Sequence, residues 1–125
     1  MSYFKGKYTL EERTRKYESA RERYPDSILV VCEGNRDPCA AHCHRLRCLP
    51  DLTVAALKKE LMQRVGLTSE QALYLYVRRY APANTVELRN LYEKYKDEDG
   101  ILYFEYAEED IYGSKNKQIN KRTHA

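Results

Sequence analysis

Cysteine and histidine side chains crowd into one short segment, and these are the residue types that bind metals or act as nucleophiles. Within ten residues the chain places Cys39, His42, Cys43, His44 and Cys48. Thiolate and imidazole are the ligands that tetrahedral zinc prefers. Structural zinc sites usually pair two separated groups of ligands, however, and no clear second group is visible here. A small zinc-binding interaction module on loop 39–48 therefore stays open as one interpretation. The other is that these are ordinary loop histidines and half-buried thiols, with no bound metal.

The same segment raises the question of enzymatic activity. A cysteine nucleophile needs a base within hydrogen-bond reach, and His42 and His44 are the candidates beside Cys43. Adjacent positions seldom bring a base onto a thiol, and the sequence shows no oxyanion site or glycine-rich phosphate loop. We therefore expect no enzyme and no cofactor. The four cysteines should be reduced, because no export signal accompanies them.

The positive charge of the chain is concentrated at its C-terminus. The formal net charge is +3, from 22 basic and 19 acidic side chains. Residues 114–125 hold four of the basic side chains and no acid, so 18 basic against 19 acidic side chains remain elsewhere. Only one aliphatic side chain, Ile119, lies in this segment, which predicts a disordered tail. A basic tail on a near-neutral domain argues against a nucleic-acid partner. Without an apolar span or signal peptide, a cytoplasmic protein is expected.

Hydrophobic periodicity predicts alternating helices and strands. Helices are expected at 10–24, 54–65 and 86–95, and strands at 28–32, 47–49, 73–77 and 101–107. The run 28–32 is apolar throughout, which is typical of a strand covered on both faces. We therefore expect a four-stranded mixed sheet with helix 54–65 on one face and helix 10–24 on the other. This order matches the ubiquitin-like β-grasp, an α+β fold, with a helical extension in front, while periodicity alone leaves other α+β folds open.

Several motifs support a resemblance to a known family. They are Phe4-Lys5, Leu10-Glu-Glu-Arg13, Leu49-Pro-Asp-Leu-Thr-Val54, Lys96-Asp-Glu-Asp-Gly100, Leu102-Tyr103 and the closing Tyr112-Gly113. In combination they resemble the autophagy ubiquitin-like modifiers, which include microtubule-associated protein light chain 3 and the GABA receptor-associated protein. The resemblance implies a domain at 1–113, made of a helical extension (1–25) and a β-grasp core (26–113). It also implies that the tail 114–125 is removed by proteolysis.

The resemblance implies a series of acyl transfers at Gly113. A cysteine protease would cut after the Tyr112-Gly113 pair, and activating and conjugating enzymes would pass the new carboxylate to phosphatidylethanolamine. Glycine suits such a position, because it has no Cβ to crowd a carbonyl that meets successive nucleophiles. The expected product is a lipid-anchored pool on autophagosome membranes beside a cytoplasmic pool. A modifier conjugated to protein instead of lipid is the alternative, and the Phe4-Lys5 extension argues against it.

The resemblance also implies a site for cargo-receptor peptides with an aromatic-x-x-aliphatic motif. A first pocket would involve Lys16, Ala20, Leu29, Val31, Leu46, Cys48 and Ile101. A second would involve Arg47, Leu49, Pro50, Leu52, Leu57 and Glu60, with Arg64 facing acids beside the motif. Several of these, including Leu29, Val31, Leu52 and Leu57, could equally be ordinary core residues.

Some of these positions depart from the family pattern. The family usually has a carboxylate where Lys16 stands, a larger aliphatic residue at Ala20, a proline at Leu29 and a phenylalanine at Ile101. It also has a lysine at the position of Leu46, although an alignment slip of one residue would place Arg45 or Arg47 there. We therefore expect a preference for peptides with acids before the aromatic residue.

Overall fold

The computed structural model describes residues 2–110, so Tyr112, Gly113 and the tail 114–125 lie outside the described residues. The helices are α1 (Tyr3–Lys7), α2 (Leu10–Arg23), a 3₁₀ turn η1 (Ala40–His42), α3 (Val54–Val65) and α4 (Leu88–Tyr95). The strands are β1 (Ile28–Gly34), β2 (Cys43–Cys48), β3 (Gln71–Tyr76) and β4 (Leu102–Asp110). Among the described residues, no helix is both long and apolar enough to span a bilayer.

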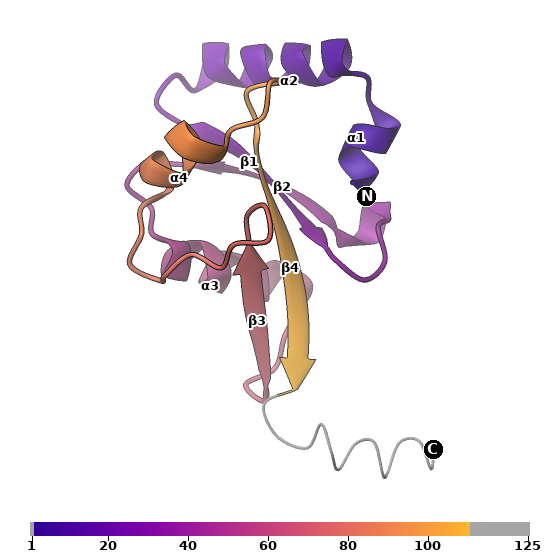
Figure 1. Cartoon of the computed structure of the whole chain (residues 1–125), viewed down its shortest axis with the longest axis vertical. Coiled ribbons are helices and arrows are strands. Elements are labelled where there is room, and N and C mark those ends of the chain that lie inside the picture. Colours follow the sequence, from indigo (N-terminus) through magenta and orange to yellow (C-terminus); the bar gives the residue numbers. More distant parts are fainter. Residues whose placement is uncertain (1, 111–125) are drawn as a thin grey trace.

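The four strands form one mixed sheet in the order β2-β1-β4-β3. The central strands β1 and β4 run parallel, while β2 and β3 pair antiparallel with them at the two edges. Helix α3 lies on one face of the sheet and the N-terminal helices lie on the other (Figure 1). The predicted ubiquitin-like β-grasp with its helical extension is confirmed.

The position of β1 in the sheet explains why polar and apolar residues do not alternate along it. Successive side chains of a strand point to opposite faces. Val30 and Cys32 face the core beneath α3, and Val31 faces a second core that includes Phe4 and Ile101. Val30, Val31 and Cys32 all have 0% exposure, so both faces of β1 are covered.

Helix boundaries follow from capping. The Thr9 hydroxyl accepts from Glu12 N–H, and the Glu12 carboxylate accepts from Thr9 N–H, which completes a capping box at the start of α2. Thr53 caps α3 by accepting from Ala56 N–H, and Gly66 ends it with a left-handed φ of 82°. The predicted helix 54–65 is therefore confirmed at both ends.

Strands β1, β3 and β4 span 28–34, 71–76 and 102–110 instead of the predicted 28–32, 73–77 and 101–107, and α2 ends at Arg23 and not at residue 24. Two further predicted boundaries are wrong. Strand β2 begins at Cys43, because antiparallel pairing with β1 extends to the Glu33–Cys43 pair; residues 43–46 were expected to be irregular. Helix α4 begins at Leu88 and not at Val86, because Glu87 is extended and bridges to Thr53. Both errors come from contacts between segments distant in the sequence.

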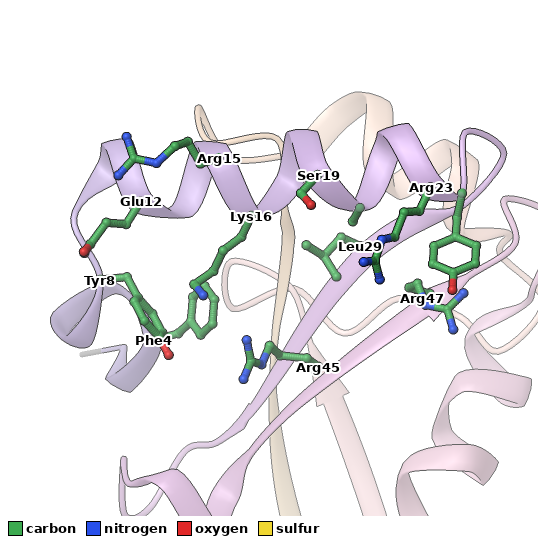
Figure 2. Close-up of a pocket in the computed structure, with 12 residues that line it drawn as sticks. Phe4, Tyr8, Glu12, Arg15, Lys16, Ser19, Arg23, Leu29, Arg45 and Arg47 are labelled. Atoms are coloured by element: carbon green, nitrogen blue, oxygen red, sulfur yellow. The ribbon is translucent and has the colours of Figure 1, made fainter.

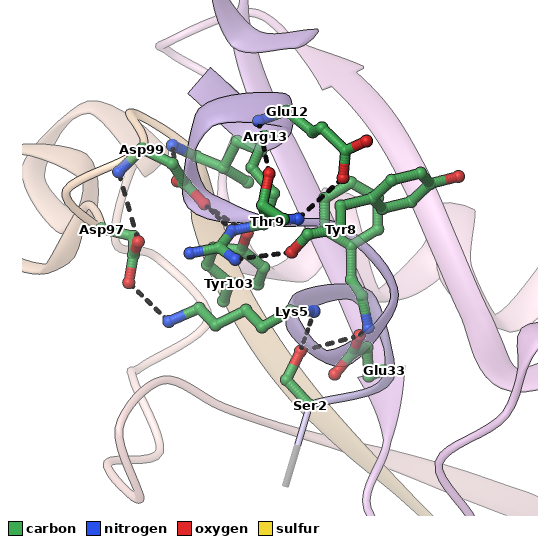
Figure 3. Close-up of polar contacts among 12 residues, drawn as sticks. Ser2, Lys5, Tyr8, Thr9, Glu12, Arg13, Glu33, Asp97, Asp99 and Tyr103 are labelled. Carbon is green, nitrogen blue, oxygen red and sulfur yellow. Dashed lines mark hydrogen bonds and ion pairs between the residues drawn. The ribbon is translucent and has the colours of Figure 1, made fainter. Parts of the chain in front are cut away.

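Polar contacts fasten the helical extension to the sheet (Figure 3). Arg13 Nε lies 2.8 Å from Asp99 Oδ2, and Tyr103 donates its hydroxyl proton to the same oxygen at 2.6 Å. At the N-terminus, the Phe4 backbone N–H donates to Glu33 Oε2 at 2.8 Å. These contacts hold α1 and α2 over β1, and other side chains of the two helices line the site described next.

Candidate functional site at the edge strand β2

Strand β2 lies at one edge of the sheet. It pairs with β1 and has no second strand neighbour among residues 2–110. An edge strand presents unpaired backbone N–H and C=O groups to whatever lies beside it. A hollow flanks β2 on each face, so backbone groups and side-chain pockets occur together here.

The first hollow, of about 560 Å³, lies between the N-terminal helices and β2 (Figure 2). Phe4, Ala20 and Leu29 provide its apolar floor. Phe4 is 2% exposed, so its ring is held firmly by the core beneath α2. The remaining lining side chains are Tyr8, Glu12, Arg15, Lys16, Ser19, Arg23, Tyr24, Arg45 and Arg47.

The rim of the first hollow is strongly cationic. Its basic side chains are Arg15, Lys16, Arg23, Arg45 and Arg47. Three of them lie over aromatic rings: Arg47 Cζ is 3.7 Å from the Tyr24 ring centroid, Lys16 Nζ is 4.4 Å from that of Tyr8, and Arg45 Cζ is 5.7 Å from that of Phe4. Glu12 is the acid in the lining, and the hydrogen bond from Thr9 N–H lowers its pKa. Because Glu12 already caps α2, the rim keeps an excess of positive charge.

The second hollow, of about 650 Å³, lies between the β2 edge and α3. Leu46, Cys48, Leu49, Leu52 and Leu57 give it apolar walls. Its other lining residues are Ala20, Leu29, Arg45, Arg47, Asp51, Ala56, Glu60 and Arg64. Four residues line both hollows, namely Ala20, Leu29, Arg45 and Arg47. The two hollows are therefore continuous around the edge strand.

The structure places most of the predicted peptide-site residues at this edge. Lys16, Ala20 and Leu29 line the first hollow, as the sequence argument expected. The second hollow contains the expected residues Arg47, Leu49, Leu52, Leu57, Glu60 and Arg64. Arg45 also lines the first hollow, which matches the alternative alignment by one residue.

Five predicted residues lie elsewhere than expected. Leu46 and Cys48 line the second hollow and not the first, because their side chains point to the α3 face of β2. Val31 and Ile101 have 0% exposure and lie in the core beneath the first hollow. Pro50 lines neither hollow, and its carbonyl accepts from Arg89 N–H at 2.9 Å.

Sequence reasoning missed the aromatic part of the first hollow. Phe4, Tyr8 and Tyr24 come from α1, its C-terminal cap and the C-terminal cap of α2. Tyr24 is 40% exposed. The sequence does contain a signal for this arrangement. Tyr8 and Tyr24 stand at the two ends of α2, where aromatic side chains can close the ends of a groove beneath the helix.

The cysteine- and histidine-rich segment does not converge on one centre. Cys39 Sγ and His42 Nδ1 are 3.4 Å apart, so a thiol–imidazole contact forms. The pair differs from the one considered from sequence, which was Cys43 with His42 or His44. Cys43 contacts Glu33, and His44 Nε2 lies 3.4 Å from the Tyr106 hydroxyl. The five-residue zinc cluster is therefore not assembled.

Burial also keeps the other thiols protonated. It raises the pKa of both Cys43 and Cys48 to about 11, and it raises the pKa of Cys32 well above its usual value. Burial lowers the pKa of His44, which favours its neutral imidazole. Since the thiolate is the nucleophile, these three cysteines are unsuited to nucleophilic attack at neutral pH.

The fold is that of a ubiquitin-like protein. It has a mixed four-stranded sheet over α3, two added N-terminal helices and an open edge strand. The family profile described as "Autophagy protein Atg8 ubiquitin like" matches residues 12–113. The chain belongs to the Atg8 family of autophagy ubiquitin-like proteins.

Related proteins align with this chain over most of its length. Autophagy-related protein 8 of Mycosarcoma maydis is 34% identical over 114 residues, which cover 90% of this chain and 97% of that protein. Autophagy-related protein 8d of Arabidopsis thaliana is 33% identical over 115 residues, which cover 90% of this chain and 96% of that protein. The crystal structure of Trypanosoma brucei ATG8 has a TM-score of 0.78 at 32% identity, covering 90% of this chain and 99% of that chain. Plasmodium falciparum Atg8 was solved in complex with a Plasmodium falciparum Atg3 peptide. Its structure has a TM-score of 0.74 at 29% identity, and the match covers 85% of this chain and 95% of that chain.

Proposed function

We propose that this chain is matured by cleavage after Gly113 and conjugated through that glycine to phosphatidylethanolamine on autophagosomal membranes. In this proposal the domain 1–113 is the modifier, and 114–125 is a basic tail that a cysteine protease removes. Gly113 lies three positions after Asp110, the last described residue of β4. While the tail is attached, the Gly113 carbonyl is part of a peptide bond and cannot be activated. Attachment of a lipid with two acyl chains then suffices for stable anchoring.

We further propose that the β2 edge receives cargo-receptor peptides as an added strand. The observation that carries this proposal is that the two hollows lie on opposite faces of one edge strand. In an extended peptide, residues i and i+3 point to opposite faces, because side chains alternate with a period of two. An aromatic-x-x-aliphatic motif beside β2 would thus direct one anchor into each hollow, while backbone hydrogen bonds supply affinity.

Conjugating enzymes are the second class of partner in this proposal. The Plasmodium falciparum relative was solved with an Atg3 peptide, and we extend that kind of contact to this chain. The functional cycle then needs a processing protease, an activating enzyme and a conjugating enzyme. The working protein would divide between the cytoplasm and a lipid-anchored pool.

Intact mass spectrometry of protein from cells tests the covalent chemistry. Gly113→Ala should retain the tail and gain no lipid, whereas Ser114→Ala, the neighbouring control, should be processed like the parent. A truncation ending at Gly113 should gain lipid without the protease. Lipidation of Gly113→Ala at the parental rate would contradict the proposal, and a mass increase that matches a protein partner would favour the protein-conjugated alternative.

Calorimetry with a motif peptide tests the edge site. Ala20→Arg should abolish binding, because Ala20 borders both hollows. Glu18→Arg is the matched control, since Glu18 is exposed on the same helix and lines neither hollow. Acidic residues before the aromatic should strengthen binding by at most about 1 kcal/mol and lose this effect in salt. Equal binding by Ala20→Arg and the parent would place the peptide elsewhere.

A further inference from the structure

Three metal-binding side chains meet in the connection between β1 and β2, outside the two hollows of the peptide site. Asp37, Cys39 and His42 each place a potential ligand atom within 4.8 Å of the other two. Asp37 was not among the residues that the sequence suggested for a metal. None of the three lines either hollow, so this cluster is independent of the proposed peptide site.

Local backbone structure brings the cluster together. Cys39 precedes the 3₁₀ turn η1, and its carbonyl accepts from His42 N–H at 3.1 Å. In a 3₁₀ turn the side chains at i and i+3 lie on the same side, which places the thiol beside the imidazole. The Asp37 carbonyl oxygen lies 3.0 Å from His42 Nδ1 and brings the third residue close. Because a carbonyl oxygen only accepts, Nδ1–H is the donor in this contact, and zinc binding at Nδ1 would replace the contact and leave the proton on Nε2.

The spacing of these atoms suits a tetrahedral metal ion. With zinc bonds of about 2.3 Å to sulfur and about 2.0 Å to nitrogen, tetrahedral geometry separates the two ligand atoms by about 3.5 Å. The distance between Cys39 Sγ and His42 Nδ1 is 3.4 Å. A thiolate and a carboxylate would together neutralise the charge of a divalent cation, and an imidazole ligand suits zinc.

The neighbourhood offers room for a further ligand. A hollow of about 300 Å³ is lined by Asp37 and His42 and also by Glu108 of β4. Its other lining residues are Gly34, Asn35, Arg36, Tyr106 and Ala107. A fourth position on the metal can therefore be filled by water, because Glu108 is not among the side chains whose ligand atoms lie within 4.8 Å of one another.

We propose that Asp37, Cys39 and His42 form a zinc-binding site on this member of the family. The site is additional to the modifier chemistry and does not require it. It differs from the five-residue module considered from sequence, because Cys43, His44 and Cys48 take no part.

Metal titration of the reduced full-length chain tests the proposal. Zinc is followed by calorimetry, and Co²⁺ is followed by the thiolate-to-cobalt absorption band, which reports a Cys ligand directly. The parent should bind one equivalent. Cys39→Ser should lose the thiolate band, and both Cys39→Ser and His42→Ala should weaken zinc binding at least about 10-fold. Asp37→Asn should weaken it by a smaller factor.

The controls use the same chemistry at nearby positions. Cys43→Ser and His44→Gln should bind zinc like the parent, and a truncation ending at Gly113 should do so as well, because the tail residue His124 is not needed. Circular dichroism confirms that each variant is folded. Failure of the parent to bind would overturn the proposal. So would parental binding by Cys39→Ser, or a loss in Cys43→Ser as large as that in Cys39→Ser.

Discussion

The ring of Tyr17 in α2 lies directly against Gly100, the glycine of the Lys96–Gly100 motif. A Cβ at Gly100 would come within 2.5 Å of Tyr17 Cδ2. The Gly100 backbone is also left-handed, with φ at 91°, and its carbonyl accepts from the Tyr92 hydroxyl at 2.9 Å. This motif thus docks α2 onto the turn before β4, and only glycine allows both the conformation and the close approach.

Gly100→Ala should therefore destabilise the fold more than Gly66→Ala. Both glycines have positive φ, but a Cβ at Gly66 would meet nothing within 4 Å. The left-handed conformation alone costs a non-glycine residue about 1–2 kcal/mol. The clash with Tyr17 should add about 1–3 kcal/mol at Gly100. Urea unfolding measures both variants, and equal losses would show that Tyr17 moves aside freely.

Arg13→Met should be strongly destabilising. It removes the cation paired with Asp99, whose side chain has 0% exposure, and leaves a buried carboxylate without its charge partner. Breaking such a pair costs about 3–5 kcal/mol. Arg15→Met is the control, because Arg15 is an exposed cation of the same helix. A loss in Arg13→Met no larger than that in the control would mean that Asp99 finds another partner.

Relief of backbone strain should make Arg79→Gly more stable than the parent. Arg78 and Arg79 form a two-residue turn with φ values of 50° and 69°, and hydrogen bonds between Val77 and Tyr80 close it on both sides. Such turns favour glycine and asparagine, because both central residues are left-handed. The expected gain is about 1 kcal/mol. Arg79→Lys keeps the strain and should change little; a destabilised Arg79→Gly would contradict the strain argument.

Stability should fall at alkaline pH, in part through Cys48. Burial raises the pKa of Cys48 to about 11 in the folded chain, whereas an unfolded thiol has a pKa of about 8.5. Between these values the unfolded chain releases a proton that the folded chain retains, so the free energy of unfolding decreases as pH rises. Thermal unfolding measured from about pH 8 to 11 should show a shallower decrease for Cys48→Ala. Parallel curves for parent and variant would exclude this contribution.

The sequence by itself determined the elements and the family. Capping residues such as Thr9, Thr53 and Gly66 mark helix ends through contacts within one turn, so local sequence suffices to locate them. The unbroken apolar run of β1 predicted two covered faces, and both are covered. The motif ending in Gly100 identified the family, because its glycine serves a close approach that few other residues permit.

Only the tertiary structure decided which side chains share a surface. Leu46 and Cys48 belong to the second hollow because the register of β2 with β1 sets the face to which each residue points. The same pairing extends β2 to Cys43 and separates that thiol from Cys39, which meets His42 and Asp37 instead. Strand register depends on contacts between distant segments, and residue spacing along the chain does not contain it.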